Sequence, residues 1–103
     1  MAEVRFTVRV ERDLTEIADR IAEDNPAAAT AFIGAIRHHC SLLVTSPRMG
    51  RARPNFGPDI RSFPHGRYIV SYRFQATIDR VEILRVWGGW RPAPTLRDLG
   101  VDK

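Results

Sequence analysis

The sequence predicts an α+β domain in which one strand and two consecutive helices precede a block of three strands. Residues 4–10 alternate between apolar and polar side chains, which is typical of a half-buried strand. Residues 13–46 repeat apolar side chains at spacings of three and four, and residues 59–87 return to alternation. Because the strands follow the helices in a block, we expect one antiparallel sheet with a helical hairpin packed on one face.

The first helix is predicted to begin at Asp13, since Asp13 and Glu16 have the spacing of a capping box. Asn25 suits the end of this helix, and Pro26 suits the first turn of the next. The inward side chains of the first helix recur at helical spacing: Leu14, Ile17, Ala18 and Ile21.

The second helix is predicted over residues 26–46 and should stop at Pro47, which cannot continue a helix. A tight turn joins it to the first helix, so the two should form an antiparallel hairpin. Its inward stripe is expected to contain Ala29, Phe32, Ile33, Ile36, Cys40 and Leu43.

Three strands are predicted next, over residues 59–63, 67–74 and 80–87, after a loop at 47–58. Short turns between them indicate an antiparallel meander. Alternation places Tyr68, Val70, Tyr72 and Phe74 on one face of the middle strand. In the last strand, alternation places Val81, Ile83 and Arg85 on one face and Glu82, Leu84 and Val86 on the other.

The bulk properties indicate a single domain over residues 1–103, with a tail at 88–103 that is loosely held or docks late. No apolar run approaches the roughly 20 residues that span a bilayer, and the N-terminus does not resemble a signal peptide. Cys40 is the single cysteine, which is unlike a disulfide-stapled secreted domain. We therefore expect a cytoplasmic protein.

Charge is divided unevenly along the chain. Residues 1–46 hold five arginines and seven acids, whereas residues 47–103 hold ten arginines, one lysine and five acids. A basic second half favours an acidic partner, either nucleic acid or an acidic protein surface. The alternative explanation for the many arginines is the codon usage of a GC-rich genome, with no specific role for the basic half.

Familiar catalytic and metal sites are not apparent. His38 and His39 are adjacent on a predicted helix and point about 100° apart, so they cannot chelate one ion together. Cys40 belongs to an apolar stripe and is expected to be an inert core residue. We expect no metal and no cofactor.

A metal-free ribonuclease is the enzymatic alternative, because it needs cations for the phosphate and an acid–base group. The candidates are Arg61, His65, Arg67 and Arg91. Geometry argues against a shared phosphate, since Arg67 and Arg73 lie six residues apart on one strand, roughly 20 Å. His65 lies in a turn-like "PHG" triplet, where a solvated histidine is the default.

The chain resembles the RelE/ParE superfamily of type II toxin–antitoxin toxins. The resemblance covers about residues 4–91 and rests on four stretches in order: "RDLTEIADRIAEDNPAAATAFI", "LLVTSPRMGRARP", "DIRSFPHGRYIVSYRF" and "VEILRVWGGWR". The proline–glycine–arginine loop and the closing "ILRV" strand look more like the ParE branch than the RelE branch. Each stretch is weak alone, and together they are specific.

The ParE resemblance implies a non-enzymatic toxin that inhibits DNA gyrase by protein–protein binding and is neutralised by a ParD-like, DNA-binding antitoxin. Nucleic acid would be contacted only through those partners. RelE-like members instead cleave mRNA on the ribosome with lysines and an arginine on the sheet. Here no lysine precedes Lys103, and Ile69 falls where that arginine would lie. The "WGGWRP" stretch also departs from the ParE pattern, which leaves the gyrase target open.

The resemblance suggests residues for both interfaces. An amphipathic antitoxin helix is expected across the hairpin, with its negative charge on three arginines; the expected contacts are Leu14, Ile17, Ile21, Phe32, Ile36, Arg61, Arg73 and Arg85. The target surface is expected to contain Arg51, Arg53, Trp87, Trp90 and Arg91. The two tryptophans have an equal alternative role in capping the core.

Overall fold

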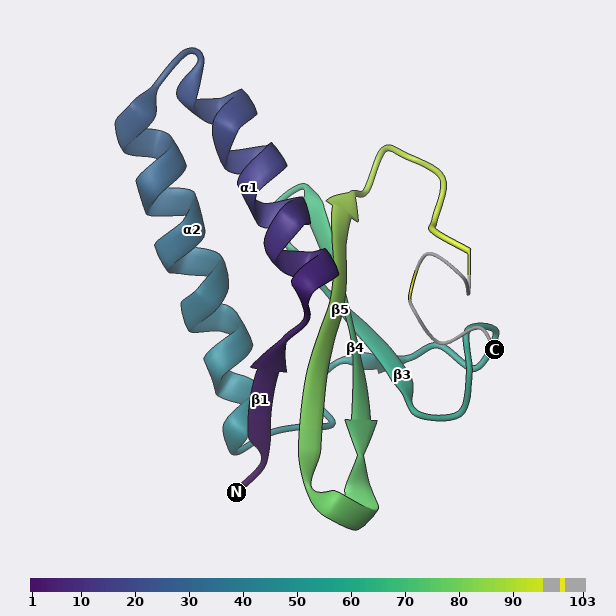
Figure 1. Ribbon diagram of the computed structural model, residues 1–103. Coiled ribbons are helices and arrows are strands. Elements are labelled where there is room, and N and C mark those ends of the chain that lie inside the picture. Colours follow the sequence, from purple (N-terminus) through teal and green to yellow (C-terminus); the bar gives the residue numbers. More distant parts are fainter. Residues whose placement is uncertain (96–98, 100–103) are drawn as a thin grey trace.

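Five strands form one mixed sheet in the computed structural model, which describes residues 1–95 and 99 (Figure 1). The sheet order is β1-β5-β4-β3-β2. The strands are β1 (Glu3–Phe6), β2 (Arg51–Ala52), β3 (Ile60–His65), β4 (Tyr68–Gln75) and β5 (Arg80–Gly88). The predicted α+β class and the β3–β4–β5 meander are confirmed. The expectation of a wholly antiparallel sheet is wrong, because β1 pairs with β5 in parallel.

Helix α1 (Val8–Ala22) begins five residues before the predicted start at Asp13. The hydroxyl of Thr7 accepts a hydrogen bond from the Val10 amide and donates one to the Ile83 carbonyl, so Thr7 caps the helix and fixes it to β5. The strand predicted for residues 4–10 therefore ends at Phe6. Its apparent alternation continued through Val8 and Val10, of which the first is exposed and the second lies in the core.

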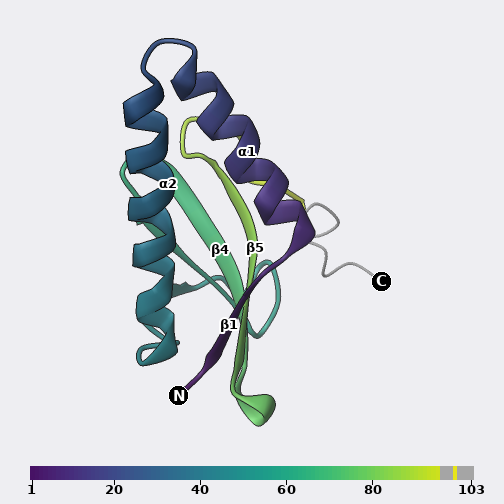
Figure 2. The same ribbon diagram turned by 60° about the vertical axis from the view of Figure 1, so that its left-hand side comes forward.

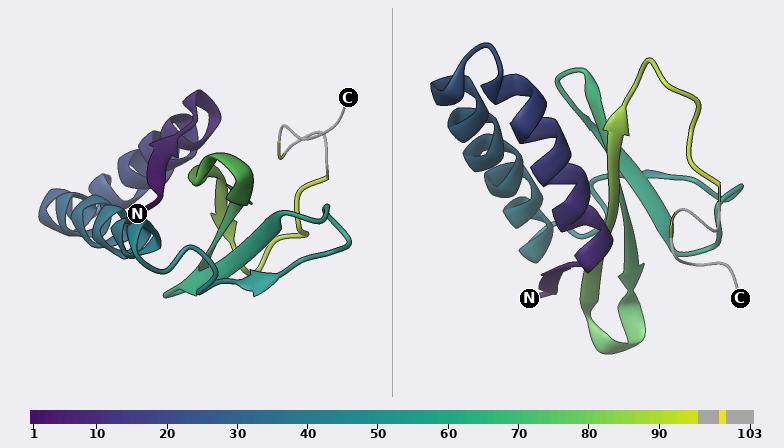
Figure 3. Two further views of the ribbon diagram at one scale, coloured as in Figure 1. Left: turned by 90° about the horizontal axis from the view of Figure 1, so that it is seen from below. Right: turned by 45° about the horizontal axis from the view of Figure 1, so that its top comes forward.

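Helix α2 (Pro26–Ser41) continues into the short 3₁₀ helix η1 (Leu42–Val44) and completes the predicted hairpin. Asn25 serves both helices: its amide donates to the Ile21 carbonyl at the end of α1, as predicted, and its side chain accepts a hydrogen bond from the Ala28 amide at the N-terminus of α2. Figures 2 and 3 show both helices on one side of the sheet. The predicted stripe faces inward, with Phe32 and Ile33 half-buried at its margin.

The segment Pro26–Val44 is long and apolar enough to cross a membrane by length and composition, contrary to the expectation that no apolar run approaches a spanning length. This is weak evidence for a span, since core helices of soluble proteins have the same property. Here Ile36, Cys40 and Leu43 are buried in the core that the helices share with the sheet. We therefore interpret it as a core helix.

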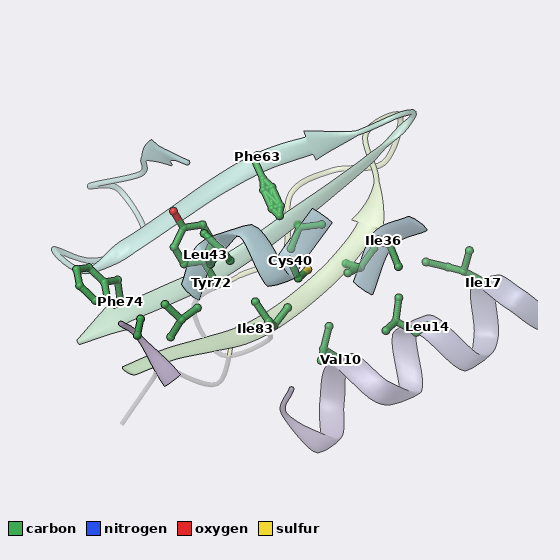
Figure 4. Packing of buried hydrophobic residues seen from close by; sticks show 14 residues of the cluster. Val10, Leu14, Ile17, Ile36, Cys40, Leu43, Phe63, Tyr72, Phe74 and Ile83 are labelled. Carbon is green, nitrogen blue, oxygen red and sulfur yellow. The ribbon is translucent and has the colours of Figure 1, made fainter. Parts of the chain in front are cut away.

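The main core lies between the hairpin and the sheet (Figure 4). The predicted inward face of β4 is confirmed. The alternation predicted for β5 fails after Ile83, because the register with β4 shifts between Ser71 and Tyr72. Val86 consequently joins Ile83 in the main core, and Leu84 is buried in a second cluster instead, with Phe56, Ile60 and Leu99.

The C-terminal tail is described over residues 88–95 and at 99. The Gly89 amide donates to the Arg67 carbonyl, which holds the first part of the tail against the β3–β4 turn. Leu99 is buried in the second cluster, so the tail docks at this residue. The rest of the predicted loose tail lies outside the described residues.

Candidate interaction site

An exposed tryptophan is held in a defined position at the end of β5. Trp90 is 54% exposed. Its ring packs edge-on against Tyr68, with 5.4 Å between ring centroids. The Arg67 guanidinium lies 4.8 Å from the Trp90 ring centroid, within the range of a cation–π interaction. A large aromatic side chain that is both fixed and accessible is the usual anchor of a protein interface.

Two consecutive glycines allow this arrangement. A Cβ atom on Gly88 would lie 2.5 Å from the Trp90 ring, too close for any side chain. The turn that follows is held by a hydrogen bond from the Arg91 amide to the Gly88 carbonyl. The "WGGWR" stretch therefore folds Trp90 back over the end of its own strand.

A small polar pocket separates Trp90 from α1. Its lining combines acidic, basic and aromatic side chains from α1, β4, β5 and the start of the tail, among them Glu16, Arg20, Tyr68, Trp90 and Arg91. Arg91 is exposed at its rim. The structure thus brings together two of the predicted target residues, Trp90 and Arg91, with Arg67 beside them.

The floor of this pocket is a buried ion pair that the sequence did not reveal. The Asp13 carboxylate accepts hydrogen bonds from Arg85 Nε at 2.6 Å and from the Val86 amide at 3.0 Å. The side chains of Asp13 and Arg85 are 7% and 14% exposed, respectively. Asp13, expected to cap a helix, instead pairs with the part of β5 beyond the end of β1.

The other predicted target residues lie elsewhere. Trp87 is only 9% exposed, which agrees with its alternative role in the core. Arg51 is exposed on β2, at the sheet edge opposite β1. Arg53 lies over the Phe56 ring and donates to the Ser62 hydroxyl, so it supports the loop before β3.

The candidate nuclease residues do not converge on one point. Arg61 donates to the backbone carbonyls of Arg48 and Gly50. His65 lies at the opposite end of β3 and contacts His39, and Arg67 is engaged with Trp90. Arg91 lines the pocket beside Trp90, so it lies near Arg67, whereas Arg61 and His65 have other partners. The four residues together therefore do not form one phosphate site with an acid–base group beside it.

His39 and His65 form a contact that spacing along the chain did not predict. Their Nδ1 atoms are 2.9 Å apart, joining α2 to the end of β3. Burial lowers the pKa of His65, and His39 lowers it further. His65 was expected to be solvated, whereas both histidines are half-buried.

Most of the residues expected to contact an antitoxin are instead buried in the core or paired with other residues of this chain. Leu14, Ile17 and Ile36 are buried in the main core, so they form no surface on the hairpin; Ile21 and Phe32 are half-buried. Among the three arginines, Arg61 binds loop carbonyls, Arg73 faces Glu82 at 3.9 Å, and Arg85 pairs with Asp13. A shallow groove between α1 and α2 is instead lined by mostly small side chains: Ala18, Asp19, Ala22, Pro26, Ala29, Thr30 and Ile33.

Cys40 should be unreactive while the protein is folded. Burial raises the pKa of its thiol to about 12, and the thiolate is the reactive form. At pH 8 we expect a chromogenic disulfide reagent to modify Cys40 only after the protein unfolds, with full modification in denaturant. Rapid modification without denaturant would show that α2 detaches readily from the sheet.

Comparison with known proteins identifies the family. The sequence profile described as "ParE toxin of type II toxin-antitoxin system, parDE" matches residues 4–91. The chromosomal ParDE toxin–antitoxin system of P. aeruginosa contains a chain that is 21% identical with a TM-score of 0.71, covering 85% of this chain and 96% of that one. The toxin–antitoxin complex RelBE2 of Mycobacterium tuberculosis contains a chain that is 26% identical with a TM-score of 0.55, covering 84% and 96%.

A search of curated protein sequences gave no match. The structural similarity to the P. aeruginosa chain supports the fold, and the profile match spans most of the sequence. The chain therefore belongs to the ParE toxin family of type II toxin–antitoxin systems.

Proposed function

We propose that this protein is a cytoplasmic toxin that arrests growth by binding DNA gyrase, with Trp90 as the central contact. The exposed, fixed Trp90 carries this proposal, because a preorganised aromatic loses little conformational entropy on binding. Arg67 and Arg91 add positive charge around it, which suits an acidic surface. The scattered positions of the nuclease candidates favour binding over RNA cleavage.

We further propose that a ParD-like, DNA-binding antitoxin neutralises the toxin by laying an amphipathic helix in the groove between α1 and α2. The small side chains of Ala18, Ala22 and Ala29 allow close approach of a second backbone, and Ile33 adds apolar surface. This proposal replaces the buried contacts Leu14, Ile17 and Ile36 with residues that line the groove, of which only Ala29 is buried.

The test is a gyrase supercoiling assay with the full-length toxin separated from its antitoxin, beside a ribosome-dependent mRNA cleavage assay. We expect loss of supercoiling with intact mRNA, and recovery of supercoiling when antitoxin is added back. Cleaved mRNA with unaffected gyrase would contradict the gyrase proposal and restore the nuclease alternative.

Replacing Trp90 with alanine should weaken gyrase inhibition by about 30-fold or more, because loss of an interface anchor typically costs at least about 2 kcal/mol. The matched control is Ile78→Ala, which removes a similarly exposed apolar side chain, 53% against 54%, in the β4–β5 turn at the other end of the sheet. Inhibition is measured as the toxin concentration that halves supercoiling. Equal effects of both substitutions would place the target surface elsewhere.

A further inference from the structure

Two imidazole rings from different elements meet at the interface between α2 and the β3–β4 hairpin. The Nδ1 atoms of His39 and His65 are 2.9 Å apart, and their ring centroids are 5.2 Å apart. Neighbouring aromatic rings hold both side chains in place. The ring centroids of Phe63 and His39 are 4.5 Å apart, and those of Phe32 and His65 are 5.9 Å apart. The pair is half-buried and therefore remains accessible to small solutes.

In the metal-free chain this contact is a hydrogen bond, which needs a proton on one Nδ1 and a lone pair on the other. If each neutral ring instead carries its proton on Nε2, both Nδ1 atoms become potential metal ligands. Two histidine nitrogens bound at tetrahedral zinc, each about 2.0–2.1 Å from the ion, lie about 3.3 Å apart. The observed separation is close to that value, and each ring must turn by roughly 35° away from the line between the two Nδ1 atoms for both lone pairs to point at one ion.

We propose that His39 and His65 form a binding site for a divalent transition-metal ion of the Zn²⁺, Ni²⁺ and Cu²⁺ class. Imidazole nitrogen suits these ions, whereas Mg²⁺ and Ca²⁺ select oxygen ligands. The ion would connect α2 to β3 and stabilise the folded chain, because the two ligands come together only on folding.

The surroundings favour a site with two protein ligands and open positions. Cys40 is adjacent to His39 in sequence, but its side chain is buried in the main core and is not a third ligand. Within residues 1–95 and at 99, no group of three or more His, Cys, Asp or Glu side chains surrounds an ion position. Water completes the coordination.

The experiment titrates the full-length chain with Zn²⁺, Ni²⁺ and Mg²⁺, following binding by calorimetry and thermal unfolding by circular dichroism. We expect one Zn²⁺ or Ni²⁺ per chain and a higher Tm with either ion, but no change with Mg²⁺. In Cu²⁺ electron paramagnetic resonance, two coupled nitrogens should appear. An absence of binding, or a spectrum with one nitrogen or none, would overturn the proposal.

The variants assign the site. His39→Gln and His65→Gln should each weaken binding by at least about tenfold, since loss of even an indirect partner of a ligand costs about that much. His38→Gln is the matched control, because His38 is the exposed neighbour of His39 on the same helix and should leave binding unchanged. Binding that survives both ligand substitutions, or that depends equally on His38, would overturn the proposal. If one of the two ligand variants misfolds, the other ligand variant and the Cu²⁺ spectrum of the wild type still test the proposal.

Discussion

Replacing Asp13 with alanine should lower the free energy of unfolding by about 3–5 kcal/mol, the usual cost of removing one partner of a buried ion pair. The substitution leaves the Arg85 guanidinium, which is 14% exposed, without the carboxylate that faces it at 2.6 Å. It also removes the acceptor of the Val86 amide, on the part of β5 that β1 does not cover. Chemical denaturation monitored by circular dichroism measures the loss.

Two controls separate the parts of this effect. Asp13→Asn keeps an oxygen for the Val86 amide but removes the charge, so it should cost less than alanine. Glu11 lies on the same helix as Asp13 and pairs with Arg37 of α2; these side chains are 45% and 40% exposed. Glu11→Ala should therefore cost less than about 1 kcal/mol. Similar losses for Asp13→Ala and Glu11→Ala would show that burial adds nothing to the Asp13–Arg85 pair.

Much of the fold was predictable because periodicity along the chain reports burial directly. The helical stripe through Ile36 and Cys40 and the alternation through Val70 and Tyr72 both give the correct inward face. The errors occur where a single local interaction overrides the pattern. Thr7 caps α1 inside an apparently continuous strand, and the register shift beside Tyr72 reverses the facing of later residues in β5.

The candidate site was predictable only in part, because its contacts join distant segments. Trp90 and Arg91 were recognisable from residue type, since aromatic and arginine side chains beyond a last strand favour an interface. The pairing of Asp13 with Arg85 spans 72 residues, and that of His39 with His65 spans 26. No spacing rule within one helix or strand encodes such contacts. The same limit explains why apolar residues assigned to an antitoxin surface are in the core.

The Tyr72 hydroxyl joins the sheet to the loop before β2, and Tyr72→Phe should lower the free energy of unfolding by about 2–4 kcal/mol. The hydroxyl donates to the Pro47 carbonyl at 2.8 Å and accepts from the Gly50 amide at 2.9 Å. Removal would leave the buried Gly50 amide and the part-buried Pro47 carbonyl without this partner. Tyr68→Phe is the matched control, as Tyr68 lies on the same face of β4 and forms no hydrogen bond through its hydroxyl to the described residues.

The same residue predicts the response of the fold to alkali. Burial raises the pKa of Tyr72 above its ordinary value of 10.0, although the Gly50 hydrogen bond and the Arg61 charge partly oppose this. The neutral phenol is thus favoured in the folded chain, and its contribution to stability is present below pH 10 and is lost as the pH rises through the folded-state pKa. Denaturation midpoints measured from pH 9 upward should fall more steeply for the wild type than for Tyr72→Phe. Parallel curves for the two proteins would contradict this prediction. They would mean that the loop junction opens before Tyr72 ionises, because the pKa of an exposed phenol is not raised by burial.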